Sequence, residues 1–258
     1  MMLIARRRDQ SKYPQLWDGL AGAWYPGAGP SGNTLYDLSG QDNHGTLTNM
    51  DAATDWVVNR GQMALDFDGL NDIIIVPHRA GNSLDITSNQ ITLSGWVYRR
   101  TATNFPYTAN KSSLGSAISY LLGANNNKLR FYIGAAALEV AHVVLNRWVF
   151  HAGTYDGGTM RIYIDGIEAA SAANTGNIPT NSDPFRIGSL GWAGASYDGF
   201  MNDIRIYNRA LHADEIKLLS QRPGIAFEPK RRVVYSIPSS AKAWLFRRQS
   251  QIIGGGLG

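Results

Sequence analysis

Cysteine is absent from the 258-residue chain, and glutamate occurs only four times. The lack of thiols excludes disulfide frameworks, thiolate zinc sites and thiol catalysis. The glutamates are Glu139, Glu168, Glu215 and Glu228, and none belongs to a Glu-x-Asp-x-x-Glu arrangement. Retaining glycoside hydrolysis needs two carboxyl groups about 5 Å apart, usually presented from alternate positions of one strand. We therefore expect a protein that is not an enzyme.

Long apolar runs are also missing. The most apolar run, residues 73–76, is far shorter than the roughly 20 residues needed to cross a bilayer. Residues 1–5 are apolar but too few for a signal core, and Arg6, Arg7 and Arg8 follow them instead of preceding them. We therefore expect neither membrane insertion nor an export signal.

Turn-forming residues, by contrast, are abundant. The 28 glycines and 10 prolines, with only 17% charged residues, are typical of short strands joined by tight turns. Helical periodicity is confined to residues 210–221, where Leu211, Ile216, Leu218 and Leu219 fit a short amphipathic helix. The composition and periodicity predict an all-β fold with one short helix near the C-terminal end of the domain.

Several segments alternate polar and apolar residues, as half-buried strands do. They are 128–133, a clearer meander of 148–155 and 160–164, and a strand at 203–207. The side chains predicted to face the core are Leu129, Phe131, Ile133, Met160, Ile162 and Ile164.

Basic residues are concentrated at the two ends of the chain. Residues 1–12 carry +3 and residues 222–258 carry +6; because the whole chain carries +4, residues 13–221 carry −5. We therefore predict a basic arm at 1–16, a domain at 17–221 and a second basic arm at 222–258. Such arms either dock on an acidic partner or are solvated ends. The arm residues predicted to bind a partner are Arg6, Arg7, Arg8, Arg231, Arg232, Arg247 and Arg248.

Five segments in order resemble the LamG-like jelly-roll family, a branch of the concanavalin A-like lectins and glucanases. They are 19–24 (GLAGAW), 37–46 (DLSGQDNHGT), 64–72 (ALDFDGLND), 92–97 (TLSGWV) and the span from Trp148 to Leu211 that includes YIDG and DIRIYNRAL. The resemblance implies a two-sheet antiparallel jelly-roll sandwich.

The resemblance also implies one structural calcium ion, with Asp37, Asn43 and Asp203 as candidate ligands. Two departures weaken this implication. Asn71-Asp72-Ile73 stands where the family usually has an acidic pair and an aromatic residue, and Asn202 replaces the first of two aspartates before the last strand. Asp and Asn are also common turn residues, so a purely structural role for the three candidates is the alternative.

The segment 222–232 (RPGIAFEPKRR) is similar to LamG proteins encoded among the virion genes of tailed phages. This second resemblance implies a virion protein, either a capsid decoration or a minor head protein, present in many copies or as a homo-oligomer and attached to capsid or other virion proteins. The alternative is a carbohydrate-binding or adhesion module of a cellular or tail-associated protein, located outside the cell or at its surface. A glycoside hydrolase is a third and weaker alternative.

Aromatic side chains in loops are the candidates for binding a cell-surface glycan, because sugar rings stack on aromatic faces beside polar groups. We expect Trp192 and Tyr197 to form the first such pair and Phe105 and Tyr107 the second, with packing in the core as the alternative for each. We do not expect a nucleic-acid partner, because no nucleic-acid-binding motif accompanies the basic arms.

Overall fold

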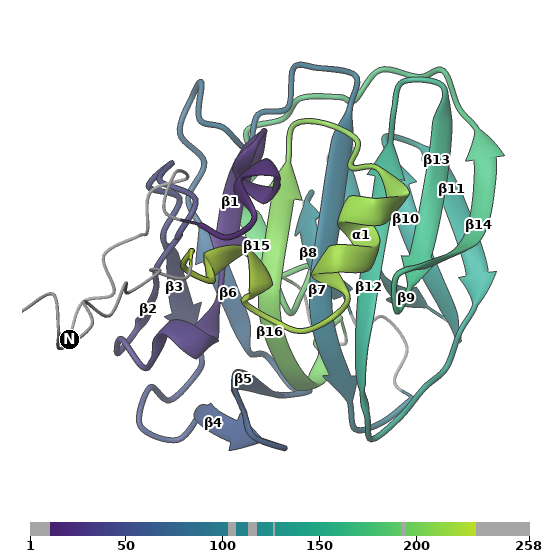
Figure 1. Cartoon of the computed structure of the whole chain (residues 1–258). Coiled ribbons are helices and arrows are strands. Elements are labelled where there is room, and N and C mark those ends of the chain that lie inside the picture. The colour runs from purple at the N-terminus through teal and green to yellow at the C-terminus, as the bar shows by residue number, and fades with distance from the viewer. Residues whose placement is uncertain (1–10, 103–106, 113–117, 126, 192–194, 231–258) are drawn as a thin grey trace, which may run out of the picture.

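The computed structural model describes residues 11–102, 107–112, 118–125, 127–191 and 195–230. Over these residues, two antiparallel eight-stranded sheets pack face to face as a sandwich (Figure 1). This arrangement confirms the predicted all-β, two-sheet jelly-roll architecture.

The first sheet has the order β14, β13, β12, β7, β16, β5 and β4, and β1 also pairs with β16. Its strands are β1 (Leu20–Trp24), β4 (Trp56–Asn59), β5 (Gln62–Asp68), β7 (Ile91–Arg99), β12 (Trp148–Tyr155), β13 (Thr159–Ile164), β14 (Ile167–Ala173) and β16 (Asp198–Tyr207). The pairing of β12 with β13 confirms the predicted meander.

The second sheet has the order β11, β10, β9, β8, β15, β6, β3 and β2. Its strands are β2 (Thr34–Leu35), β3 (Gly45–Thr48), β6 (Ile73–Val76), β8 (Tyr107–Lys111), β9 (Tyr120–Asn125), β10 (Lys128–Ile133), β11 (Ala136–Ala141) and β15 (Phe185–Ile187).

One hydrophobic core lies between the two sheets. The predicted core residues Leu129, Phe131 and Ile133 of β10 are buried in it, as are Met160 and Ile162 of β13, with Ile164 packed against its margin. Burying one such side chain contributes roughly 1.5–3 kcal/mol. The sheets also approach closely at Gly153 of β12, where a Cβ atom would lie 2.5 Å from the Phe131 ring.

The predicted helix is α1 (Ala213–Leu219), which lies across the outer face of the first sheet (Figure 1). It starts after His212 because the Glu215 carboxylate accepts the His212 backbone N–H at 3.0 Å, as in a capping box. Ile216 and Leu219 of α1 are buried against the sheet. In the described part of the chain, α1 is the only α-helix, and no helix has the length and apolar character of a membrane span.

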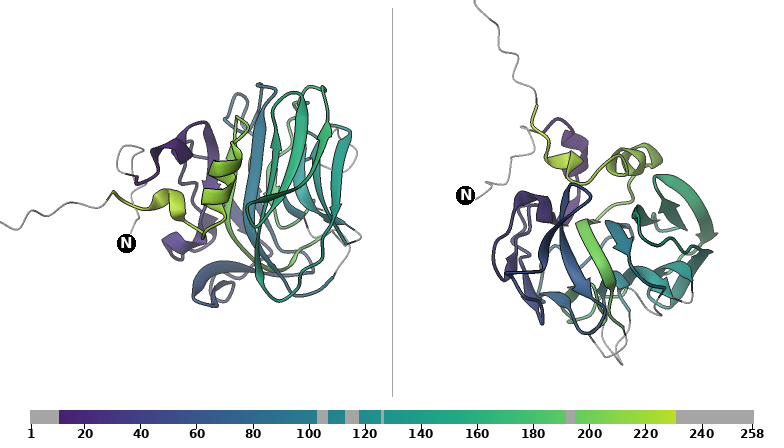
Figure 2. Two further views of the ribbon diagram at one scale, coloured as in Figure 1. Left: turned by 45° about the vertical axis from the view of Figure 1, so that its right-hand side comes forward. Right: turned by 90° about the horizontal axis from the view of Figure 1, so that it is seen from below.

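The folded body extends beyond both predicted domain boundaries. The 3-10 helices η2 (Pro14–Trp17) and η4 (Ile225–Phe227) pack beside each other near α1, whereas η3 (Pro26–Ala28) follows β1 (Figure 2). Leu16, Ile225 and Ala226 are at most 1% exposed. Residues 11–16 and 222–230 are therefore part of the sandwich and not of the arms, because their apolar side chains complete its second hydrophobic cluster.

Candidate functional site

The two outer faces of the sandwich differ in what covers them. On the first sheet, outward-facing Trp96, Phe150 and Tyr207 are buried beneath α1, η2 and η4. This face is therefore occupied by the chain itself. The outer face of the second sheet carries the aromatic and charged side chains considered next.

Strand register places these side chains in two rows on the outer face of the second sheet. Because Phe131 and Leu122 face the core, their neighbours along β10 and β9 face outward. One row across the strands is Glu139, Arg130, Gly123 and Tyr107. The next row is Tyr132, Leu121, Asn110 and Arg186. Gly123 has no side chain, so only backbone atoms lie between Arg130 and Tyr107 in this row.

A small apolar cluster lies on this face. Its buried members are Tyr107, Leu121, Leu190 and Ala195, and Tyr132 packs against them. Burial raises the pKa of Tyr107 to about 12, so its phenol stays protonated and can donate a hydrogen bond at neutral pH. The structure thus places Tyr107, a predicted site residue, beside Tyr132. The sequence analysis did not name Tyr132. The alternation in 128–133 could have identified it, because it turns this side chain away from the core.

Charged groups border the apolar cluster. Arg130 Nε lies 2.7 Å from Glu139 Oε1, and Lys128 Nζ lies 2.9 Å from Glu139 Oε2. Arg130 Nη1 also donates to Tyr132 Oη at 3.4 Å. The hydrogen bond from Lys128, together with the charge of Arg130, lowers the pKa of the Glu139 carboxyl. Glu139 is therefore an ionised partner of two cations and is poorly suited to act as a general acid.

The other aromatic predictions have different outcomes. Tyr197 is not a surface residue: its ring is 1% exposed and packs edge-on against Phe67 at 6.2 Å in the core. Tyr197 therefore takes the alternative role of packing in the core and is not accessible to a glycan, because its ring is turned inward against Phe67. Phe105 and Trp192 lie outside the described residues, as do the seven arm arginines. The described neighbours of Phe105 and Trp192 in sequence, Tyr107, Leu190 and Ala195, belong to the apolar cluster.

The oxygen atoms of the predicted calcium ligands face hydrogen-bond donors. Asp37 Oδ1 accepts the Ala23 and Ser39 backbone N–H groups at 2.9 Å each, and Oδ2 accepts that of Asn43 at 3.0 Å. The Asn43 amide donates to Ala21 O at 3.0 Å. These contacts are those of a braced loop.

Asp203 has different partners from those of Asp37 and Asn43. Its carboxylate forms a bidentate pair with Arg205 at 2.7 and 2.9 Å and accepts the Gly224 N–H at 2.8 Å. Within the described ranges, no group of three or more His, Asp or Glu side chains is arranged as metal ligands. The three candidates do not fit a calcium ion, which needs several oxygen atoms free of other partners.

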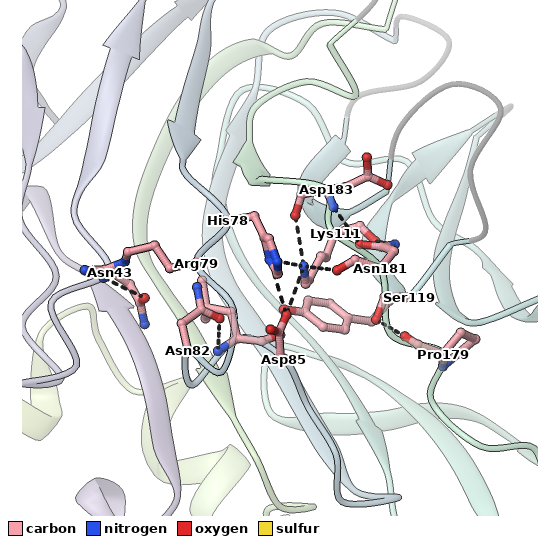
Figure 3. Close-up of polar contacts among 12 residues, drawn as sticks. Asn43, His78, Arg79, Asn82, Asp85, Lys111, Ser119, Pro179, Asn181 and Asp183 are labelled. Carbon is pink, nitrogen blue, oxygen red and sulfur yellow. Dashed lines mark hydrogen bonds and ion pairs between the residues drawn. The ribbon is translucent and has the colours of Figure 1, made fainter.

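A different buried cluster surrounds a protein cation, the ammonium group of Lys111 (Figure 3). Lys111 Nζ donates to the carbonyl oxygens of Asn181 and Asp183 at 2.9 Å each. It also lies 3.2 Å from Asp85 Oδ1 and 3.4 Å from His78 Nδ1. The side chain is 2% exposed. Lys111 therefore joins the end of β8 to the loops after β6 and before β15, which gives it a structural role that the sequence pattern did not indicate.

Comparison with known proteins identifies the class of this sandwich. The chain belongs to the concanavalin A-like lectin/glucanases superfamily, whose model matches residues 68–217. This result confirms the lectin and glucanase part of the predicted resemblance. No curated protein matches the chain.

Several solved structures share the fold. Domain 4 of the extracellular GH43 arabinanase AbnA from Geobacillus stearothermophilus, solved with arabinotriose, is 21% identical, with a TM-score of 0.62 over 82% of this chain and 100% of that one. The receptor binding domain of botulinum neurotoxin C/D mosaic serotype is 18% identical, with a TM-score of 0.61 over 80% and 51%. Trypanosoma rangeli sialidase is 21% identical, with a TM-score of 0.58 over 78% and 32%. This chain thus spans about half of the toxin domain and a third of the sialidase.

Proposed function

We propose that this domain is a non-enzymatic carbohydrate-binding module whose ligand face is the outer face of the second sheet. The observation that carries the proposal is Tyr132, a partly exposed ring that lies beside the guanidinium group of Arg130 on this face and packs against the buried Tyr107 cluster. Apolar faces of sugars stack on aromatic rings, while adjacent polar groups orient the hydroxyls.

Two further observations support a binding role. The arabinanase domain that shares the fold over its full length was solved with arabinotriose, a property of that domain. In the two outward-facing rows, Glu139 is the only carboxylate, and Lys128 and Arg130 hold it. Hydrolysis of a glycosidic bond by the usual mechanism needs a second carboxyl group.

The test compares the glycan affinity of the parent chain with that of a Tyr132→Ala variant. The full chain is screened on an oligosaccharide array that includes arabinotriose, and the tightest ligand is then titrated by calorimetry. We expect Tyr132→Ala to weaken binding about five- to thirtyfold, which corresponds to the loss of about 1–2 kcal/mol of stacking and burial. Phe200→Ala, which removes a partly exposed ring from the first sheet, should bind like the parent. Equal affinity of the two variants would contradict the proposed face.

We also propose that this module is a virion structural protein, a capsid decoration or minor head protein anchored by its basic arms. The supporting observation is an antiparallel bridge between Ser11 and Pro229, with the Lys12 N–H donating to Glu228 O at 2.7 Å. The two arm sequences, 1–10 and 231–258, therefore join the body at one place. Their charges of +2 and +5 suit a single acidic docking surface.

Co-purification with capsids tests this second proposal. Capsids of the virus that encodes the chain should retain the full chain and lose the variant truncated after Lys230, with both forms folded by circular dichroism. Retention of the truncated form would exclude the C-terminal arm as the anchor. Failure of both forms to bind would contradict the virion role and leave the carbohydrate-binding proposal unaffected.

A further inference from the structure

We propose that residues 142–147, the crossover segment that joins β11 of the second sheet to β12 of the first, open locally in acid. Protonation of His142 and His151 separates the two rings and releases the crossover segment, while the rest of the sandwich stays folded. This inference is independent of the proposed ligand face and of the basic arms.

Two histidine rings are in contact where β11 ends and β12 begins. His151 alternates along β12 with the same parity as Val149 and Tyr155 of the main core, so its ring points between the sheets. The His142 ring packs edge-on against it, with 5.0 Å between the ring centroids and 78° between the ring planes. A proton on either ring therefore places a charge directly against the other ring.

The surroundings of His151 oppose its protonation. The residue is 4% exposed, and its Nε2 atom has no hydrogen-bond partner among the described residues. The charges that act on the ring come from His142, from Arg99 at the end of β7 and from Arg147 in the crossover segment, and all three are cationic when charged. Burial, followed by these charges, holds the pKa of His151 well below 6.5.

The surroundings of His142 are similar. Asp165, in the turn after β13, is the carboxylate that favours its protonation, whereas Arg147 and Arg99 oppose it. Asp165 is already engaged, because its Oδ2 lies 3.0 Å from the Arg147 guanidinium and its Oδ1 accepts the Phe150 N–H at 2.9 Å. Burial is the largest cause that lowers the pKa of His142. The closed segment therefore favours two neutral rings.

The crossover segment is attached by contacts that a local opening can break. The His142 N–H donates to Asn127 O at 3.0 Å, and the Asn146 N–H donates to Arg99 O at 2.8 Å. Val144 packs against the margin of the main core. The segment belongs to no strand, so its release breaks fewer contacts than the unfolding of a sheet does.

Opening and protonation are linked through the difference in pKa. In the open segment the imidazoles regain a pKa of about 6.5, whereas the closed segment holds that of His151 well below this value. The open form therefore binds more protons, and its population rises as the pH falls below about 6.5. Protonation of His151 in the open form alone raises the opening equilibrium about tenfold between pH 7.5 and pH 5.5.

The experiment is amide hydrogen exchange of the full chain by NMR at pH 7.5 and pH 5.5, at several low urea concentrations. The His142 and Asn146 amides report the opening. Their protection factors, corrected for the intrinsic effect of pH on exchange, should fall at least about tenfold in acid. They should not depend on urea, because a local opening exposes little surface. The Phe131 amide of β10 reports global unfolding and should lose protection as urea increases.

Glutamine variants assign the effect to the two rings. His151→Gln should remove most of the pH dependence, and His142→Gln, at the less buried ring, should reduce it and serves if the first variant does not fold. His212→Gln is the matched control, because His212 is exposed just before α1. Protection factors that are unchanged between the two pH values would overturn the proposal. The same urea dependence at His142 and Asn146 as at Phe131 would also overturn it, because the histidines would then act only through global unfolding.

Discussion

Lys111 lies in an environment that is unusual for a lysine, since lysine is almost never fully buried without partners. Its ammonium has a carboxylate, two carbonyl oxygens and an imidazole nitrogen around it. Removing one partner of a buried pair leaves the other charge uncompensated. Lys111 and Asp85 therefore compensate each other's charge, and removing either side chain should destabilise the fold.

Lys111→Met should lower the free energy of unfolding by about 3–5 kcal/mol, because the largely buried carboxylate of Asp85, 15% exposed, would lose its ammonium partner. Urea denaturation monitored by fluorescence gives the value. Lys217→Met, at an exposed lysine of α1, should change stability by less than about 0.5 kcal/mol. Similar losses for the two variants would argue against a special role for the buried ammonium.

The bonding of Asp37, Asn43 and Asp203 leads to a prediction about metal removal. Since their oxygen atoms already accept N–H groups, dialysis against EDTA should leave the melting temperature unchanged, and added calcium should not raise it. Differential scanning calorimetry with and without calcium measures both effects. A rise of several degrees on adding calcium would show that a cation site exists after all, as the family resemblance implies.

The buried ring of His151 should make the stability of the protein depend on pH. The ring is 4% exposed, and burial, followed by the charges of His142 and Arg99, holds its pKa well below 6.5. The unfolded chain then binds a proton near pH 6.5 that the folded chain binds only at lower pH. This histidine should therefore cost stability progressively as the pH falls below about 6.5, and have no effect above it.

The pH effect is measured as the difference in unfolding free energy between the parent and a His151→Gln variant from pH 8 to pH 5. The parent should lose stability relative to the variant as the pH falls. A constant difference across this range would mean that His151 titrates normally in the folded protein.

At the scale of elements, the segment 222–230 behaves as part of the domain. Gly224 donates to Asp203, the Phe227 ring lies 4.8 Å from the Arg205 guanidinium, and the Ser11 hydroxyl donates to Ala226 O at 2.6 Å. The Asp203 and Arg205 pair is buried in part because this segment covers it. Its removal would expose both a buried ion pair and an apolar cluster.

Truncation after Lys230 should therefore leave the melting temperature within about 2 °C of the full chain, whereas truncation after Gln221 should lower it by well over 5 °C or prevent folding. The second effect follows from losing several kcal/mol of burial at Ile225 and Ala226, where 1 kcal/mol corresponds to about 2–4 °C in a domain of this size. Thermal melts of the two truncated proteins and of the full chain measure both changes in melting temperature. Equal stability would restore the boundary predicted at residue 222.

The sequence predicted those elements whose signal is local. Alternation over 128–133 and 160–164 identified strands and their core faces, and the spacing of Ile216 and Leu219 identified α1. Contacts between distant residues could not be predicted in this way. Lys111 meets Asn181 across 70 positions, and Ser11 meets Ala226 across 215. The pairing of Tyr107 with Tyr132 likewise depends on strand register, which no single segment of sequence specifies.

At the scale of the whole molecule, the sandwich has two unlike sides. The arms join it beside η2 and η4, which cover the first sheet, whereas the proposed ligand face belongs to the second sheet (Figures 1 and 2). A protein held by its arms would therefore direct its ligand face away from the support. This arrangement suits a domain that is displayed on an assembly.

The two-sided arrangement can be tested by immobilisation. Full-length protein attached to a sensor through a C-terminal biotin should bind its glycan with the same Kd as protein free in solution, within about twofold. Protein attached through random surface lysines, including Lys128 on the ligand face, should show a reduced active fraction. Loss of binding on C-terminal attachment would mean that the arm and the ligand share one side.

The bridge between Ser11 and Pro229 has a consequence for how this domain can be combined with others. Because its entry and exit points are neighbours, the domain occupies little more room in a host chain than a tight hairpin does. It can therefore be transplanted as a cassette into a surface loop of an unrelated protein without forcing the ends of that loop apart. The same closeness would allow the natural ends to be joined and new ones to be opened elsewhere, as in a circular permutant.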